Sequence, residues 1–183
     1  RGACEFDGKI SVVDGRLYAR ANLVRRNASN GMFGGRHVQV LSFEPLSKFE
    51  LISVRDYRGV GAPPVSGDNV YFAAVAENPV DRGRSVLGLF PVVRNDDDKD
   101  DAFVGLALSC DGFEFSPLRR VLNSTPASLG RSSDHPVIGL VARGDAVFFY
   151  IHRGVQGVFD DDRDAARLPP SRVVRYAASA DAL

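Results

Sequence analysis

Short segments in which hydrophobic and polar residues alternate run along the whole chain, separated by tight turns. Near the start of the chain, four such segments lie at 9–13, 16–21, 37–43 and 49–54. Asp14-Gly15 separates the first two, and Asp-Gly between two apolar runs is a strong hairpin signal because both turn positions tolerate positive φ. We find no amphipathic helix. The pattern predicts four antiparallel strands, which is the size of one propeller blade.

The same plan recurs twice further along the chain. The expected strands of the second unit lie at 69–76, 86–93, 103–109 and 113–118, and those of the third unit lie at 137–142, 147–152 and 172–177. We therefore predict a single all-β, β-propeller-like domain over residues 1–183, with about three to four four-stranded antiparallel blades. The units span approximately 7–55, 68–122 and 134–178.

An aspartate stands before the first strand of each unit, and this repeat supports the division. The three copies read Asp7-Gly8-Lys9-Ile10, Asp68-Asn69-Val70-Tyr71 and Asp134-His135-Pro136-Val137. Because the innermost strands of a propeller begin near the central axis, these carboxylates would converge although they are distant in sequence. Convergent carboxylates are what the cleavage of a glycosidic bond requires. The alternative is that each Asp accepts backbone N–H groups in a turn.

Composition narrows the classes of partner. Lys and Arg total 23, Asp and Glu also total 23, and 44% of the 183 residues are hydrophobic. This balance argues against a basic nucleic-acid surface and against a disordered chain. No apolar run approaches the ~20 residues that cross a bilayer, so we expect no membrane span. Arg and Asp far outnumber Lys and Glu, which suits strands and turns better than helices.

No metal or cofactor motif is apparent. Cys4 and Cys110 are two buried thiols or one bridge, and two cysteines do not make a metal site. The stretch 95–101 holds five Asp but no Gly or Glu, so we interpret it as a solvated hairpin loop rather than a calcium loop. Two glycosylation triplets, which begin at Asn27 and Asn123, favour a secretory route.

Three motifs together resemble the five-bladed β-propeller glycoside hydrolases, the superfamily of arabinanases, xylosidases, invertases and levansucrases. They are Asp134-His135-Pro136-Val137, the Asp-Gly and Gly-Asp turns before 17–18 and 147–150, and Ser109-x-Asp-Gly-x-x-Phe. The resemblance implies carbohydrate processing at the axial mouth. Five blades need roughly 250 residues at this repeat length, so the chain is expected to form a partial propeller.

By position, the resemblance assigns catalytic roles to the three aspartates. Asp7 would serve as base or nucleophile, Asp68 as the modulating acid, and Asp134 would stand where that superfamily has an acid Glu. The departure at position 134 puts the general acid in doubt, and Glu77 is an alternative. The rival hypothesis is a non-catalytic propeller that binds a glycan or a protein.

Further polar residues are candidates for contacting a carbohydrate substrate or ligand. Arg131 and His135 flank Asp134 in a compact polar turn, and we expect them to orient hydroxyl groups. The remaining candidates are Arg20, Arg36, Asn69, Glu77 and His152. For the arginines the alternative is a scattered distribution in an Arg-rich protein, and for the histidines it is a structural hydrogen bond.

Overall fold

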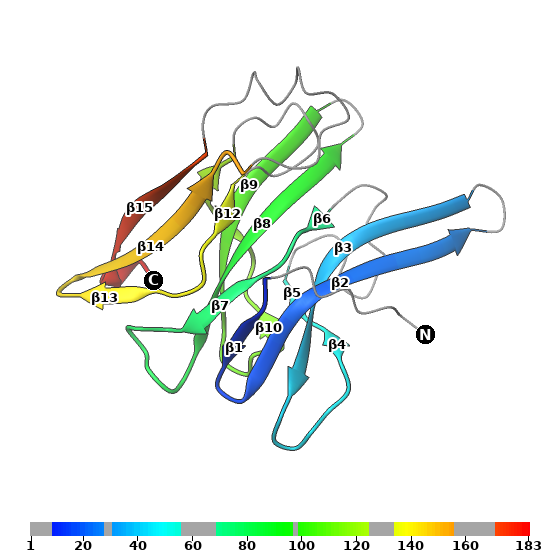
Figure 1. Cartoon of the computed structure of the whole chain (residues 1–183). Helices are drawn as coiled ribbons and strands as arrows, with labels where there is room; N and C mark the ends of the chain where they lie inside the picture. Colours follow the sequence, from blue (N-terminus) through cyan, green and yellow to red (C-terminus); the bar gives the residue numbers. More distant parts are fainter. Residues whose placement is uncertain (1–8, 28–30, 56–68, 97–98, 125–133, 156–170) are drawn as a thin grey trace.

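The computed structural model describes residues 9–27, 31–55, 69–96, 99–124, 134–155 and 171–183. Over these residues the protein is all-β, as the alternating pattern predicts. Three antiparallel sheets follow one another along the chain (Figure 1). In the described part of the chain, no helix has both the length and the apolar character that a membrane crossing requires.

The first sheet has the strand order β1-β2-β3-β4. Its strands are β1 (Ser11–Val13), β2 (Arg16–Asn27), β3 (Gly31–Ser42) and β4 (Glu50–Leu51). The predicted Asp-Gly hairpin is confirmed, with φ of 47° at Asp14 and 65° at Gly15. The β2–β3 hairpin runs further than the apolar pattern predicts, because unbroken backbone pairing continues to Asn27 and Gly31.

The second sheet repeats this plan, with four strand positions from its inner to its outer edge. Its strands are β6 (Asn69–Val70), β7 (Ala74–Glu77), β8 (Val86–Asp96), β9 (Lys99–Ser109) and β11 (Arg119–Asn123). Both β6 and β7 pair with β8, so together they occupy the innermost strand position of this sheet. The β8–β9 ladder continues to the pair Asp96 and Lys99, so strand pairing extends into the acidic stretch interpreted as a loop.

The prediction that segment 113–118 forms the fourth strand of the second unit is wrong. Only β10 (Glu114–Phe115) is a strand there, and it pairs in parallel with β5 (Ser53–Val54) of the first unit. Asp111 Oδ1 accepts the N–H groups of Phe113 and Glu114, each at 2.8 Å, and so holds the turn that follows β9. The segment still returns to β9, because Ser116 N donates to Leu108 O at 2.8 Å. The outer strand of the second sheet is instead β11.

The third sheet has three strand positions over the described residues. Its strands are β12 (His135–Pro136), β13 (Val141–Arg143), β14 (Ala146–Arg153) and β15 (Arg172–Ser179). Both β12 and β13 pair with one edge of β14, and β15 pairs with the other. The prediction of a strand over 137–142 is wrong for most of that range: β12 ends at Pro136 and β13 begins at Val141, and Gly139, with φ of 111°, lies between them.

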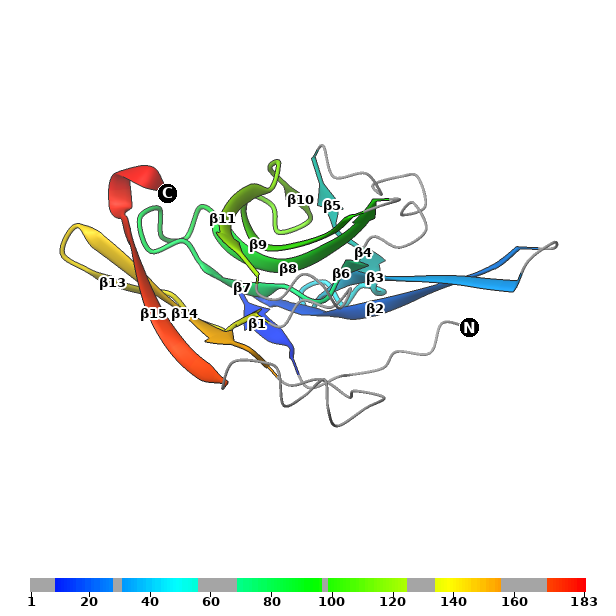
Figure 2. The same ribbon diagram turned by 90° about the horizontal axis from the view of Figure 1, so that it is seen from above.

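The sheets are arranged like the blades of an incomplete propeller, with β1 and β7 on the inside (Figure 2), and β12 of the third sheet contacts β8 of the second. Ser11 joins two inner strands, since its Oγ donates to Ala73 O at 3.1 Å and accepts from Val75 N at 2.9 Å. One apolar core, including Tyr18 and Phe90, lies between the first and second sheets, and a second core lies between the second and third sheets. Each unit therefore buries its apolar face only by stacking on the next.

Candidate functional site

Residues from all three sheets meet where the inner strands begin. Lys9 stands just before β1, Tyr71 and Phe72 lie between β6 and β7, and His135 opens β12. Arg36, from β3, joins them because its guanidinium lies 4.5 Å from the centre of the Tyr71 ring. We call these five residues the hub cluster. Its members lie up to 126 positions apart in the sequence, and the stacking of the three sheets brings them together.

A polar contact between the first and third units lies at the centre of the hub cluster. Lys9 Nζ lies 2.8 Å from His135 Nδ1. An ammonium group has donors only, so Lys9 donates and His135 Nδ1 accepts. Because Nδ1 accepts in this contact, the ring N–H is on Nε2, and that nitrogen is buried.

Two aromatic rings of the second unit lie beside this polar pair. The Phe72 ring meets the His135 ring edge to face, with centroids 5.5 Å apart and an interplanar angle of 84°. Lys9 Nζ lies 4.7 Å from the centre of the same ring, an arrangement that attracts a cation to the π face. Phe72 is buried, whereas Tyr71 is half-buried. Phe72 therefore packs beneath the polar pair, and the hub cluster presents polar groups beside the half-buried ring of Tyr71.

Asp134 is buried within its own unit. It is 0% exposed, its Oδ2 lies 3.1 Å from Arg153 Nη2, and its Oδ1 accepts the Gly154 N–H at 3.0 Å. Arg153 also donates to the Tyr176 hydroxyl at 3.0 Å. Desolvation lowers the pKa of Arg153, but the bonds to Tyr176 and Asp134 outweigh it and raise the pKa overall. Asp134 thus ties β12 to β14 and β15, as the backbone-capping alternative predicts.

Several sequence-predicted residues lie outside what the structure describes. They are Asp7, Asp68, Arg131 and Cys4. Asn69 begins β6 and pairs through its backbone with Val93, but its side chain is not described. The separation between the predicted catalytic carboxylates therefore stays a prediction.

Three further candidates are placed by the structure, and two of them, His152 and Arg20, lie near the hub cluster. His152 lies directly across from His135 in the β12–β14 pair, and its Nε2 contacts the hydroxyl of Ser171. Arg20 is half-buried on β2, opposite Val38, so it shares a sheet face with Arg36 as a diagonal neighbour. The structure therefore brings four predicted residues together: Arg20, Arg36, His135 and His152.

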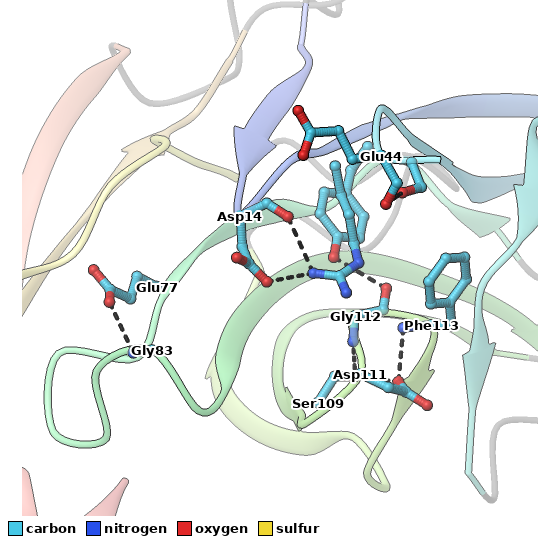
Figure 3. Close-up of polar contacts among 11 residues, drawn as sticks. Asp14, Glu44, Glu77, Gly83, Ser109, Asp111, Gly112 and Phe113 are labelled. Carbon is cyan, nitrogen blue, oxygen red and sulfur yellow. Dashed lines mark hydrogen bonds and ion pairs between the residues drawn. The ribbon is translucent and has the colours of Figure 1, made fainter. Parts of the chain in front are cut away.

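Glu77, the alternative general acid, lies far from this group. It ends β7, five residues after Phe72, and at the usual strand rise that is roughly 16 Å. The Glu77 side chain is exposed, and its Oε1 accepts the Gly83 N–H at 2.9 Å (Figure 3). It cannot act on a ligand held at the hub cluster.

Glu77 instead lines a cavity of about 290 Å³ between the first and second sheets, which we call the Arg16 cavity. Asp14 and Arg16 form one wall and are ion-paired (Figure 3). Beneath them, the Tyr18 hydroxyl donates to Gly112 O at 3.0 Å, and burial raises the pKa of Tyr18 to about 12.

The turn that closes the Arg16 cavity is held by a carboxylate. Desolvation raises the pKa of Asp111, but bonds from Glu114 N, Phe113 N and the Ser109 hydroxyl outweigh it and lower the pKa overall. Asp111 is therefore a turn former, as its Asp-Gly position indicates.

The described part of the chain holds no group of three or more His, Cys, Asp or Glu side chains arranged to bind a metal ion. Cys110 is a free, exposed thiol beside the Arg16 cavity.

Sequence reasoning did not select Lys9 or Phe72, and it favoured a core role over sugar stacking for Tyr71, which lies in the expected strand at 69–76. A usable signal existed for Lys9, since it is one of only three lysines and stands directly before the first inner strand. Tyr71 and Phe72 carried no such signal, because aromatic residues in alternating strands usually belong to the core.

No protein-family model matches the chain, and no curated protein sequence matches it either.

Proposed function

We propose that the protein binds carbohydrate at the hub cluster. Sugars present hydroxyl groups around the ring and an apolar C–H face, so a site that holds donors beside an aromatic surface suits both. The observation that supports this proposal is the contact of Lys9 with His135 beside the rings of Tyr71 and Phe72. Ligand sites generally combine apolar lining with a few placed polar groups.

Binding is better supported than bond cleavage because of Asp134. A general acid must come within hydrogen-bond reach of the oxygen that it protonates. Asp134 is wholly buried, and both of its oxygens are engaged by Arg153 and Gly154. Asp134 stabilises the third sheet, so a sugar bound at the hub cluster would not contact its carboxylate.

Calorimetry with arabino-, xylo- and fructo-oligosaccharides tests the proposal. Lys9→Ala and Arg36→Gln each remove a donor, and we expect each to weaken binding about tenfold, which corresponds to roughly 1.4 kcal/mol. Lys48→Ala is the matched control because Lys48 is an exposed lysine outside the hub cluster. Equal affinities for all three variants and the parent would refute a hub site.

Cleavage of glycosidic bonds is the second candidate, favoured by the meeting of inner-strand starts at Lys9 and His135. Asp7 and Asp68 stand two and three positions before Lys9 and Tyr71 in sequence. Hydrolysis of aryl arabinosides and xylosides by the parent, lost in Asp7→Asn and Asp68→Asn but kept in Asp145→Asn, would support this function. Parent protein without activity, or equal rates in all variants, would reject it.

A further inference from the structure

Positive charge is concentrated in the β2–β3 hairpin. From position 16 to position 42 the sequence holds no Asp, Glu or Lys but five arginines, which are Arg16, Arg20, Arg25, Arg26 and Arg36. Over the whole chain, Lys and Arg total 23 and so do Asp and Glu, so the remainder of the chain carries an excess of five acids. A chain of zero net charge that segregates its charge in this way has one element suited to a polyanion.

The hairpin extends well beyond the strands that flank it. β2 and β3 pair over their whole length, as far as Asn27 and Gly31, and both views show the hairpin projecting from its sheet (Figure 1, Figure 2). β1 pairs with β2 only as far as Tyr18, and β4 pairs with β3 only at Gln39 and Val40. The outer part of the hairpin therefore pairs with no other described strand. A two-stranded hairpin alone is only marginally stable in water, so a bound partner would stabilise it.

The backbone register places three arginines in one row that leads to the hub cluster. Arg36 pairs with Asn22 of β2. Arg20 and Arg26 each lie an even number of positions from Asn22 along the same strand, so the three arginine positions share one face of the hairpin. Arg20 and Arg26 are six residues apart, which is roughly 20 Å at the usual strand rise. Because Arg36 contacts Tyr71, the inner end of the row lies at the hub cluster.

A row of arginines suits a linear chain of carboxylates. A guanidinium binds a carboxylate through two parallel N–H···O bonds, which a lysine cannot match. A polysaccharide of uronic acids repeats a carboxylate along an extended chain of sugar rings, so it offers acceptors to the hairpin and hydroxyl groups to the hub cluster. Nucleic acid is less favoured, because domains that bind it are strongly basic as a whole, whereas this chain has no net charge.

We propose that the β2–β3 hairpin binds an acidic polysaccharide of the polyuronate class, which runs from the hub cluster along the row of arginines. The proposal rests on carbohydrate binding at the hub cluster and adds the charge of the sugar to it. Arg25 and Arg26 belong to the outer part of the hairpin and not to the hub cluster, so variants at these positions separate the two contributions.

Calorimetry with oligogalacturonate and with its methyl ester tests the requirement for charge. The two ligands share the same sugar rings, but the ester lacks the ionised carboxylates. At low salt we expect oligogalacturonate to bind at least about tenfold more tightly than the ester, because charge-assisted hydrogen bonds are lost in the ester. Added salt should reduce this difference by screening. Equal affinities for the two ligands, or no binding of oligogalacturonate at millimolar concentration, would overturn the proposal.

Two variants distinguish failure at the hairpin from failure at the hub cluster. Arg25→Gln/Arg26→Gln should weaken the binding of oligogalacturonate about tenfold and leave that of the ester unchanged. Lys9→Ala should weaken the binding of both ligands. Unchanged oligogalacturonate affinity in the hairpin variant would refute the hairpin proposal and leave the hub site standing. Unchanged affinity of both ligands in Lys9→Ala would refute the hub site itself, and with it the path along the arginines.

Matched variants show whether charge is the cause. Arg82→Gln/Arg84→Gln removes two exposed arginines from the turn between β7 and β8 and should leave both affinities unchanged. Arg25→Lys/Arg26→Lys keeps both charges and should retain most of the oligogalacturonate affinity, which a misfolded hairpin would not. Duplex DNA that binds as tightly as oligogalacturonate, with the same loss in Arg25→Gln/Arg26→Gln, would assign the hairpin to nucleic acid instead. Concentration-dependent sedimentation of the parent that this variant abolishes would assign it to a second copy of the chain.

Discussion

Lys9 and His135 lie 126 positions apart in the sequence, yet Lys9 Nζ and His135 Nδ1 are only 2.8 Å apart. Lys9 precedes the first inner strand of the chain and His135 opens that of the third unit. This pair therefore shows that the starts of inner strands converge, although neither residue is an acid.

A double-mutant cycle tests that convergence in solution. Lys9→Ala and His135→Ala should show a coupling energy of about 1 kcal/mol in urea unfolding, because both changes remove the same hydrogen bond. Lys48→Ala combined with His135→Ala should be additive, because Lys48 lies in an exposed turn outside the cluster. Additivity of the first pair as well would mean that the two side chains do not meet.

Asp134→Asn tests whether this aspartate supports the fold. We expect a loss of about 2–3 kcal/mol in the free energy of unfolding, because the change removes the ion pair to Arg153 and weakens the bond from Gly154. Asp145→Asn, at an exposed turn position, should change stability by less than about 0.5 kcal/mol. A more stable Asp134→Asn protein would instead indicate a strained functional carboxylate.

Gly112→Ala should cost about 2–4 kcal/mol of stability. The glycine has φ of 76°, and an added Cβ would lie 2.6 Å from Tyr18 Oη and 2.7 Å from Arg16 Cδ. Gly144→Ala is the matched control, since φ is 59° there and nothing lies within 4 Å of the added Cβ, so only the backbone cost of about 1–2 kcal/mol remains. Equal thermal or urea stabilities for the two variants would show that the first and second units do not pack at Gly112.

Tyr18 makes the protein less stable at high pH. Its pKa is about 12 in the folded protein and about 10 in the unfolded chain. The unfolded state therefore loses its proton first, so the stabilisation is complete below pH 10 and is lost as the pH rises to 12.

The parent should accordingly lose about 2 kcal/mol more than Tyr18→Phe between pH 10 and pH 12. Urea unfolding at both pH values measures this difference, and Tyr150→Phe should behave as the parent does. If the free energy of unfolding of Tyr18→Phe falls between pH 10 and pH 12 as much as that of the parent, the Tyr18 hydroxyl is not buried.

The units were predictable because each strand repeats a local pattern that short-range chemistry determines. Asp14-Gly15 specifies its hairpin through positive φ at both positions, and the first sheet follows from it. The pairing of Glu114–Phe115 with Ser53–Val54 was not predictable, because it depends on how the first and second units stack. Segment 113–118 has the alternation of a strand, but the carbonyl groups of Phe113 and Phe115 accept from Ser53 N and Arg55 N of the first unit, each at 2.9 Å.

The candidate site was predictable only in part. The repeated Asp predicted convergence at the inner-strand starts, and His135, next to Asp134, contacts Lys9. Asp7 and Asp68 lie outside the described residues, so the convergence of the carboxylates stays a prediction. The role of Asp134 depended on Arg153, whose position across the third sheet no local spacing reveals. Tyr71 and Phe72 resemble core residues in the sequence, and their contacts with Lys9 and Arg36 of the first unit depend on how the units stack.

Mapping a bound oligosaccharide by nuclear magnetic resonance tests the central proposal most directly. Titration with the tightest-binding arabino-, xylo- or fructo-oligosaccharide should move the side-chain signals of Lys9, Tyr71 and His135, and should leave Glu77 and Lys48 unmoved. Shifts confined to the Arg16 cavity, or no shift at the hub cluster at saturating sugar, would contradict carbohydrate binding at the point where the three units meet.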